Sequence, residues 1–220
     1  MKTVYIIVEG PTEEEFVNNS IADHLRGYGI VNTLPILLET SPGFFGGDVS
    51  FSRYERNVQN LLSRDANAIV TSLIDYYKLH TDFPGYIHAH TLRVKNAQCD
   101  HLEQQLALTI NNQRFIPYIQ LHEFEGLLFS DTRGFDYIRN ISPVNRTEIA
   151  NIIAAFDNPE MIDDGEMTHP SKRLKRLIPK YKKPFHGPII ALENGMTPIL
   201  QKCPRFNLWI DNLVAAASTP

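Results

Sequence analysis

The opening of the chain, an apolar run that stops abruptly at an acid, is the feature that most constrains the fold. Val4–Val8 is continuously apolar, which is typical of a strand buried on both faces of a parallel sheet. Glu9 follows directly, and a Gly-Pro pair then makes a turn. Thr12, followed three residues later by Glu15, matches a capping box and predicts that a helix begins there. The chain therefore opens as strand, turn and helix, with a carboxylate where the strand emerges.

Strand and helix signals continue to alternate as far as about residue 130. Apolar runs predict strands at residues 4–8, 33–38, 68–74 and 115–121. Between them we expect helices at residues 12–26, from a second capping box at Ser52 and Glu55 onward, and at 92–110, with a glycine-rich loop at 40–50. This alternation predicts an α/β fold, a mostly parallel sheet of about four strands with helices on both faces.

Strand signals fade from Asp131 onward. Short helices are expected at residues 148–156, 171–177, 189–192 and 208–214, with frequent prolines keeping them short. We therefore predict an α/β core over residues 1–130 and a helical C-terminal appendix over residues 131–220 packed on it, with a single domain as the alternative.

Composition limits the kinds of partner and compartment. The 220 residues carry a formal net charge of −4, so any binding of nucleic acid would need a local basic patch. Cys99 and Cys203 lie far apart, which favours a reducing compartment without a disulfide framework. No run approaches the length of a membrane helix, and the first apolar run is too short for a signal peptide. We expect a cytoplasmic globular protein.

Acids stand where three of the four predicted strands end. Glu9 follows the first, Asp75 the third, and Glu123 and Glu125 the fourth. Because the carboxyl ends of parallel strands lie at one edge of a sheet, these carboxylates should converge. Clustered carboxylates repel one another unless a cation or a proton neutralises them, and oxygen ligands favour Mg²⁺ or Mn²⁺. The alternative is that each acid caps a helix or lies in solvent.

At these residues the chain resembles a prokaryotic TOPRIM-like family, domain-of-unknown-function family 4276. The motifs that carry the resemblance are Val-Glu-Gly-Pro-Thr-Glu at 8–13, Leu-Ile-Asp-Tyr-Tyr at 73–77, His-Glu-Phe-Glu-Gly-Leu-Leu-Phe-Ser-Asp at 122–131, Pro-Ser-Lys-Arg-Leu at 170–174, His-Gly-Pro-Ile-Ile-Ala at 186–191 and Cys-Pro-Arg-Phe-Asn-Leu-Trp at 203–209. TOPRIM folds are compact parallel α/β sheets of topoisomerases, primases and overcoming-lysogenization-defect nucleases.

The resemblance implies a nuclease that depends on Mg²⁺ or Mn²⁺ and acts with an ABC-type or SMC-like ATPase in bacterial defence or repair. It implies Glu9 as general acid/base or metal ligand, and Asp75 as the first acid of an Asp-x-Asp metal motif. Tyr77 stands where that motif has its second acid. Glu123 or Glu125 could supply the missing ligand, and Glu125 is favoured because the Phe-Glu pair recurs in related TOPRIM-like proteins. His122 is then either a proton shuttle beside the metal ligands or a structural histidine.

Residues 172–183 form a local basic segment within an acidic chain. Its first members, which could hold the phosphate backbone of DNA or RNA, are Lys172, Arg173, Lys175 and Arg176. Lys172 could instead reach the carboxylates and stabilise charge that develops on a phosphate, as a catalytic group. A solvated helix face is the third possibility.

Two functions remain open. One is a metal-dependent nuclease whose Glu9, Asp75 and Glu125 converge. The other is a non-catalytic subunit that keeps the fold and docks an ATPase or nucleic acid. Tyr77 favours the second, as would carboxylates held by lysine or arginine.

Overall fold

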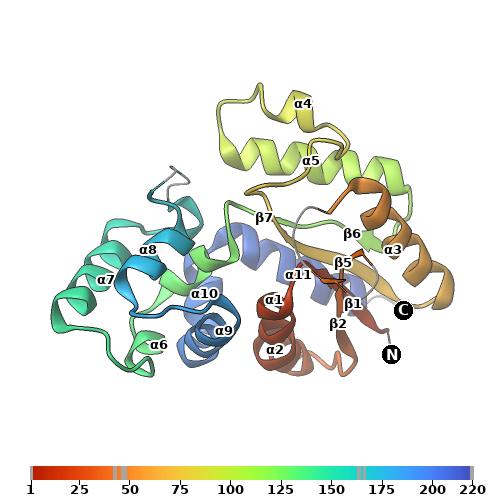
Figure 1. Ribbon diagram of the computed structural model, residues 1–220. Helices are drawn as coiled ribbons and strands as arrows, with labels where there is room; N and C mark the ends of the chain where they lie inside the picture. The colour runs from red at the N-terminus through yellow and green to blue at the C-terminus, as the bar shows by residue number, and fades with distance from the viewer. Residues whose placement is uncertain (1, 42–43, 46–48, 163–164, 166, 219–220) are drawn as a thin grey trace.

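Five parallel strands form the centre of the computed structural model, which describes residues 2–41, 44–45, 49–162, 165 and 167–218 (Figure 1). The strands are β1 (Val4–Val8), β2 (Thr33–Leu37), β5 (Ile69–Asp75), β6 (Phe115–Ile116) and β7 (Ile119–Gln120). Their order is β2-β1-β5-β6, with β7 also paired to β5, and every pair is parallel. The predicted α/β class and the mostly parallel sheet are confirmed.

Helices make up most of the rest of the described chain. The first is one continuous helix with a π-helical middle, α1 (Pro11–Phe16), η1 (Val17–Ile21) and α2 (Ala22–Arg26). Up to residue 130 there follow α3 (Phe51–Arg64), α4 (Tyr86–Ala89), α5 (Lys95–Ile110) and the 3₁₀ segment η2 (Phe124–Ser130). The second half holds α6 (Arg133–Asp136), α7 (Pro143–Ala155), η3 (Pro159–Met161), α8 (Pro170–Leu177), α9 (Lys183–Asn194), α10 (Met196–Lys202) and α11 (Pro204–Ser218).

The sheet has an apolar layer on each face because side chains alternate along its strands. Val4, Ile6 and Val8 pack into one cluster with the first helix and with α11. Ile7 points the opposite way, into a second cluster with α3 and α5. Helices therefore cover both faces, as predicted.

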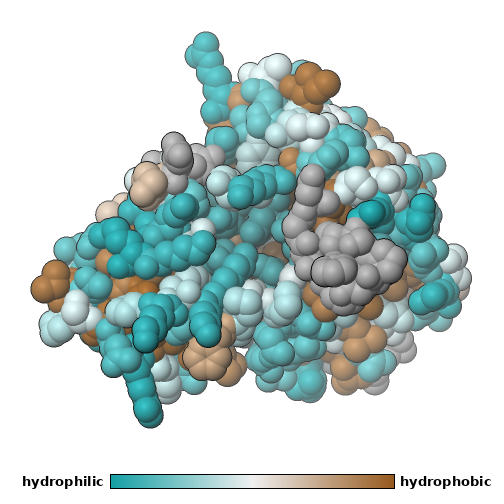
Figure 2. All heavy atoms as spheres, in the orientation of Figure 1, coloured by the Kyte–Doolittle hydropathy of each residue, from teal (hydrophilic) through white to brown (hydrophobic). Residues whose placement is uncertain are grey.

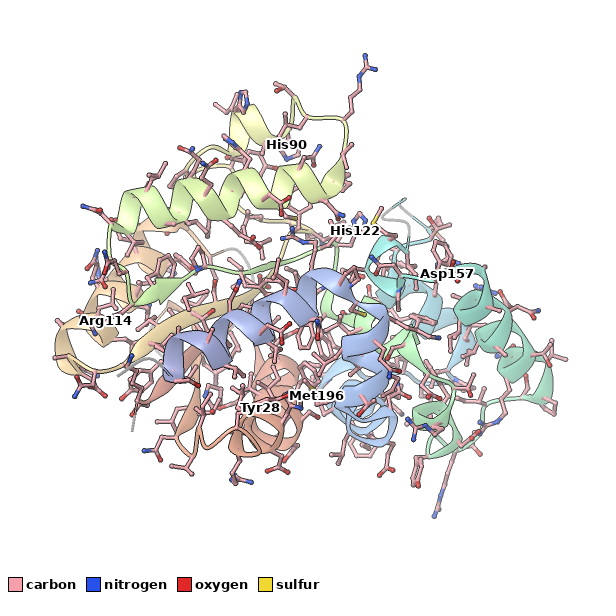
Figure 3. All side chains as sticks on the ribbon, turned by 180° about the vertical axis from the view of Figure 1, so that it is seen from behind. Tyr28, His90, Arg114, His122, Asp157 and Met196 are labelled. Carbon is pink, nitrogen blue, oxygen red and sulfur yellow. The ribbon has the colours of Figure 1, made fainter. Side chains whose placement is uncertain are left out.

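Helices α6 to α10 lie beyond the carboxyl edge of the sheet, on the left of Figure 1. From there α11 returns across the sheet, as the view from behind in Figure 3 shows. The Trp209 indole N–H donates to Thr71 Oγ1 of β5 at 2.8 Å, and the Trp209 ring stacks on Tyr118. One hydrophobic cluster thus joins residues from both predicted segments; the division at residue 130 stays a prediction.

Both capping boxes are wrong. The first helix begins at Pro11, after Gly10, without a side-chain cap, and Thr12 is buried. A proline suits this position because the first helical N–H has no partner within the helix. The α3 helix begins at Phe51, whose N–H donates to the Asp82 carboxylate at 3.0 Å. A side chain distant in sequence therefore replaces the local cap.

Three further expectations need correction. Helices α7, α9 and α11 are longer than predicted and α10 was not predicted, because prolines such as Pro143 and Pro184 lie in the first turn of a helix, where no hydrogen bond is lost. The strand expected at 115–121 is divided into β6 and β7 around Pro117. The predicted loop at 40–50 contains an antiparallel pair, β3 (Glu39–Ser41) with β4 (Phe44–Phe45).

The two cysteines, Cys99 and Cys203, are buried free thiols. None of the described helices is long and apolar enough to cross a membrane.

Candidate functional site

The register of β1 with β5 brings the first two strand-end acids together. Val8 lies opposite Leu73, so Glu9 emerges beside Asp75, and the Asp75 backbone N–H donates to Glu9 Oε1 at 2.9 Å. Asp75 Oδ1 in turn accepts from the Phe124 N–H at 2.8 Å. The hydrogen bond to Phe124 links the end of β5 to the segment that carries the remaining strand-end acids.

A lysine amine lies at the centre of this acidic edge. Lys183 Nζ is 3.0 Å from Glu13 Oε1, 3.2 Å from Glu125 Oε2 and 3.7 Å from Asp75 Oδ2. Glu13 comes from the first turn of α1, and Lys183 is the first residue of α9. We call Glu9, Glu13, Asp75, Glu125 and Lys183 the carboxylate cluster; it joins four acids to one ammonium group.

Burial and mutual repulsion make Glu9, Asp75 and Glu125 hold protons more tightly. Burial, with Glu13 nearby, raises the pKa of Glu9 to about 7. Burial also raises the pKa of Asp75 well above its usual range, although Lys183 works against it, and the pKa of Glu125 rises for the same reasons. Burial alone would lower the pKa of Lys183, but Asp75, Glu125 and Glu13 outweigh it and raise that pKa. The ammonium therefore stays charged, and four acids share the single positive charge that it supplies.

Glu123 does not join the carboxylate cluster. Its two oxygens accept from the backbone N–H of Ser171 at 2.8 Å and from Ser171 Oγ at 3.0 Å. Because Ser171 lies in the first turn of α8, Glu123 serves as an acidic cap for that helix. Its side chain still lines the same cavity as Glu9 and Asp75.

The cluster opens into a polar cavity of about 760 Å³ between the sheet and the C-terminal helices. In Figure 2, hydrophilic residues gather around the hollow between these two parts. Four lysines line the cavity together with the acids: Lys78, Lys172, Lys175 and Lys183. The acids are thus concentrated at the sheet edge, Lys183 lies among them, and α8 supplies Lys172 and Lys175.

The predicted basic face divides in two. Lys172 and Lys175 are exposed and line the cavity. Arg173 donates to the Thr168 carbonyl at 2.5 Å. Arg176 forms an ion pair with Glu148. The structure therefore places two of the four residues, and not the two arginines, beside the carboxylates.

Tyr77 and His122 flank the site. The Tyr77 ring stacks on His169 at a centroid distance of 4.9 Å, so the aromatic group in the Asp-x-Asp position is part of the cavity wall. The backbone of Tyr77 donates to the His122 carbonyl at 2.8 Å. His122 is buried, and Figure 3 shows it at the junction of the sheet with the C-terminal helices. Its role as proton shuttle or structural histidine stays a prediction.

The donors of the carboxylate cluster are the hard oxygen ligands that Mg²⁺ and Mn²⁺ prefer. Both buried carboxylate oxygens of Glu125 lack a hydrogen bond among the described residues. Within the same residues, however, no group of three or more acids, histidines or cysteines is arranged to hold a metal ion. The cation that these carboxylates surround is the Lys183 ammonium. The oxygen donors have the chemistry that a divalent ion prefers, and the cation among them in this conformation is Lys183.

Sequence reasoning missed Glu13 and the position of Lys183. Glu13 lies inside the 8–13 motif but does not directly follow a strand, so it is not identified by a search for acids at the ends of strands. Lys183 is one of many cations in its segment, and nothing in the spacing singles it out. Only the packing of α9 against α1 and η2 brings it to the acids.

Comparison with known proteins gives one family. The family described as "Domain of unknown function (DUF4276)" matches residues 8–214. No curated protein sequence matches the chain. Among solved structures, the C-terminal region of the Xanthomonas campestris pv. campestris OLD protein is similar, with 17% sequence identity and a TM-score of 0.44 over 97% of this chain and 94% of that one. The family match spans the strand-end acids Glu9, Asp75 and Glu125 together with Glu13 and Lys183, so the chain, with its carboxylate cluster, belongs to the DUF4276 family.

Proposed function

We propose that the chain is a divalent-metal-dependent phosphodiesterase that cuts nucleic acid. One observation carries the proposal: four carboxylates surround a single ammonium group, and two of them, Glu9 and Asp75, line a cavity that lysines of α8 also line. Excess acid attracts a hard cation, and lysines attract phosphate. A polymer of phosphodiesters is the substrate class that needs both.

Glu9, Asp75 and Glu125 would hold the ion. A bound Mg²⁺ or Mn²⁺ polarises a phosphodiester and lowers the pKa of a water molecule. The protein's own contribution is to keep these acids close together through the Asp75–Glu9 and Phe124–Asp75 hydrogen bonds. Glu123, whose oxygens are used by Ser171, would act from outside this set.

The lysines would orient the substrate. Lys172 and Lys175 lie one turn apart on α8 and line the cavity, so both can contact phosphates on one strand. Lys172 is the candidate for stabilising charge on the scissile phosphate. Arg173 and Arg176, which are held by other groups, would contribute less.

A non-catalytic docking subunit is the second candidate, because the Lys183 ammonium already neutralises part of the cluster and Tyr77 replaces an acid. The partner ATPase that the resemblance implies stays a prediction under both candidates.

Titration of the purified chain with Mn²⁺ by calorimetry tests the proposal. Binding should occur in the wild type, be lost in Asp75→Asn and Glu9→Gln, and persist in Glu15→Gln, a matched change at an exposed acid of α1. Cleavage of labelled DNA and RNA in Mn²⁺ should follow the same pattern. Cleavage that survives both site variants would refute the assignment, and absence of both binding and cleavage would favour the docking role.

A further inference from the structure

A second concave surface lies beside α9, outside the carboxylate cluster. It is a groove of about 770 Å³ between the residues that follow α6 and those that precede and open α9. Ile138 and Ile189 contribute its apolar floor. We call it the aromatic groove, and its rim is formed by Tyr137, Arg139, Asn140, Lys180, Lys182 and Phe185.

Two aromatic rings on this rim are unusually exposed. Tyr137 and Phe185 each have 62% of their surface accessible. Burying such rings is favourable, and an exposed pair on one groove marks a contact site more often than an isolated exposed residue does. A ligand of this groove should therefore have apolar or aromatic faces that can pack against the two rings.

The charge on the same rim is positive. Arg139, Lys180 and Lys182 are exposed and form no ion pair with any described residue. None of the described residues that line the groove is acidic. The occupant should therefore carry negative charge along its length as well as flat faces.

The groove is held in shape by its neighbours. Gly134 packs against α9 so closely that an added Cβ would lie 2.2 Å from the Ile190 carbonyl oxygen. The Lys182 N–H donates to His186 Nδ1 at 2.9 Å, which fixes the start of α9. Phe185 packs edge-on against the His186 ring. A preformed groove of this kind loses little entropy when a ligand binds.

The groove and the carboxylate cluster both use residues at the start of α9. Lys182 lies on the rim of the groove, whereas the next residue, Lys183, contacts Glu13 and Glu125.

We propose that the aromatic groove binds single-stranded nucleic acid, with bases stacked on Tyr137 and Phe185 and phosphates held by Arg139, Lys180 and Lys182. Unpaired bases supply the flat faces and the backbone supplies the charge, and stacking tolerates any base sequence. A duplex hides its base faces, so it should bind more weakly. This inference rests on the proposed function and adds its substrate class, single-stranded nucleic acid.

Fluorescence anisotropy with a labelled 20-nucleotide oligo-dT or oligo-U tests the groove in EDTA, where no metal takes part. We expect Phe185→Ala and Tyr137→Ala each to weaken binding about 5- to 100-fold. Tyr28→Ala, which removes an exposed ring on another surface, should leave binding unchanged. Arg139→Ala should weaken binding and lower the slope of log affinity against log salt by about one. The two oligonucleotides distinguish DNA from RNA.

Three results would overturn the proposal. The first is oligonucleotide binding that survives in the Phe185→Ala and Tyr137→Ala double variant, and the second is equal affinity for a 20-base-pair duplex. The third is self-association of the wild type that disappears in the double variant, which would make a second copy of the chain the occupant. Because all four changed side chains, Phe185, Tyr137, Tyr28 and Arg139, are exposed, the variants should keep the melting temperature of the wild type. Mn²⁺ binding by the double variant separates the two hypotheses. If the double variant binds both Mn²⁺ and the oligonucleotide as the wild type does, the groove proposal alone fails. If the wild type binds the oligonucleotide but binds no Mn²⁺, the groove proposal stands and the nuclease proposal fails.

Discussion

The Lys183 ammonium lies 3.2 Å from Glu125 Oε2 in a buried setting that also holds Glu9, Glu13 and Asp75. Lys183 is therefore the cation around which the site is organised, although it belongs to a helix far along the chain from β1. It balances only part of the acidic charge, since four carboxylates face it.

Replacing this lysine should destabilise the protein. Lys183→Met leaves the acids without a counterion, and we expect a loss of about 3 kcal/mol in the free energy of unfolding at pH 8, because breaking a buried ion pair leaves uncompensated charge. The loss should shrink at pH 5, where the carboxylates take up protons. Urea denaturation at both pH values measures it, with the exposed neighbour change Lys182→Met as control.

The Lys183→Met variant also tests whether the lysine competes with a metal ion for the carboxylates. If Lys183 occupies the cation position, Lys183→Met should bind Mn²⁺ more tightly than the wild type and regain melting temperature when Mn²⁺ is added. Weaker binding would show that the ammonium shapes the metal site instead of competing for it. Differential scanning fluorimetry with and without Mn²⁺ distinguishes the two.

The stability of the metal-free protein should fall as pH rises. The pKa of Glu9 is about 7 in the folded chain against an ordinary 4.5, so the folded state binds the proton more tightly. Its contribution is complete below about pH 4.5 and is lost as pH rises through 7. Asp75 and Glu125 act in the same direction. Glu9→Gln keeps the acceptor for the Asp75 N–H and should flatten this profile, with a gain of about 2 kcal/mol at pH 8. Glu15→Gln should leave the profile unchanged, and a wild-type stability that is flat from pH 5 to 8 would contradict the raised pKa values.

How much of the structure can be predicted from the sequence depends on whether the pattern behind each feature lies within one segment. The apolar run before Glu9 predicted β1 correctly, and the strand ending at Asp75 was equally clear, because a strand buried on both faces leaves a continuous apolar run. Parallel pairing then follows from the intervening helices, so the juxtaposition of Glu9 with Asp75 was predictable. The fold class therefore came from patterns within single segments.

The misses required contacts between distant segments. Thr12 lies against Gly187 of α9 instead of capping its own helix, and Asp82 replaces the expected cap of α3. Lys183 reaches the acids only through the packing of the C-terminal helices, which carry no strand-like pattern. Residues of one segment show how that segment folds, but they do not identify the neighbours that it meets.

The hydrogen bond between α11 and the sheet offers a test of the predicted boundary at residue 130. Thr71→Val removes the acceptor of the Trp209 indole N–H, and we expect a loss of about 1–3 kcal/mol because a buried donor is left unsatisfied. If residues 1–130 and 131–220 form one cooperative unit, fluorescence of Trp209 and far-ultraviolet circular dichroism should report the same urea midpoint. Separate midpoints would indicate two domains. Thr109→Val, an exposed change on α5, is the control.

The contact between α6 and α9 should be equally sensitive to a single methyl group. In Gly134→Ala the new Cβ would lie 2.2 Å from the Ile190 carbonyl oxygen and 2.7 Å from Asn194 Oδ1, so the backbone of one helix has to move. Overpacking of this kind costs about 1–3 kcal/mol or more, and the loss should appear as a lower melting temperature. Since Tyr137 follows α6 and Phe185 lies in the first turn of α9, separation of these helices should also weaken oligonucleotide binding. Thr132→Ala, at the exposed start of α6, is the control and should change neither the melting temperature nor the oligonucleotide affinity. Destabilisation with full oligonucleotide affinity would show that the two rings do not need this helix contact to bind a strand.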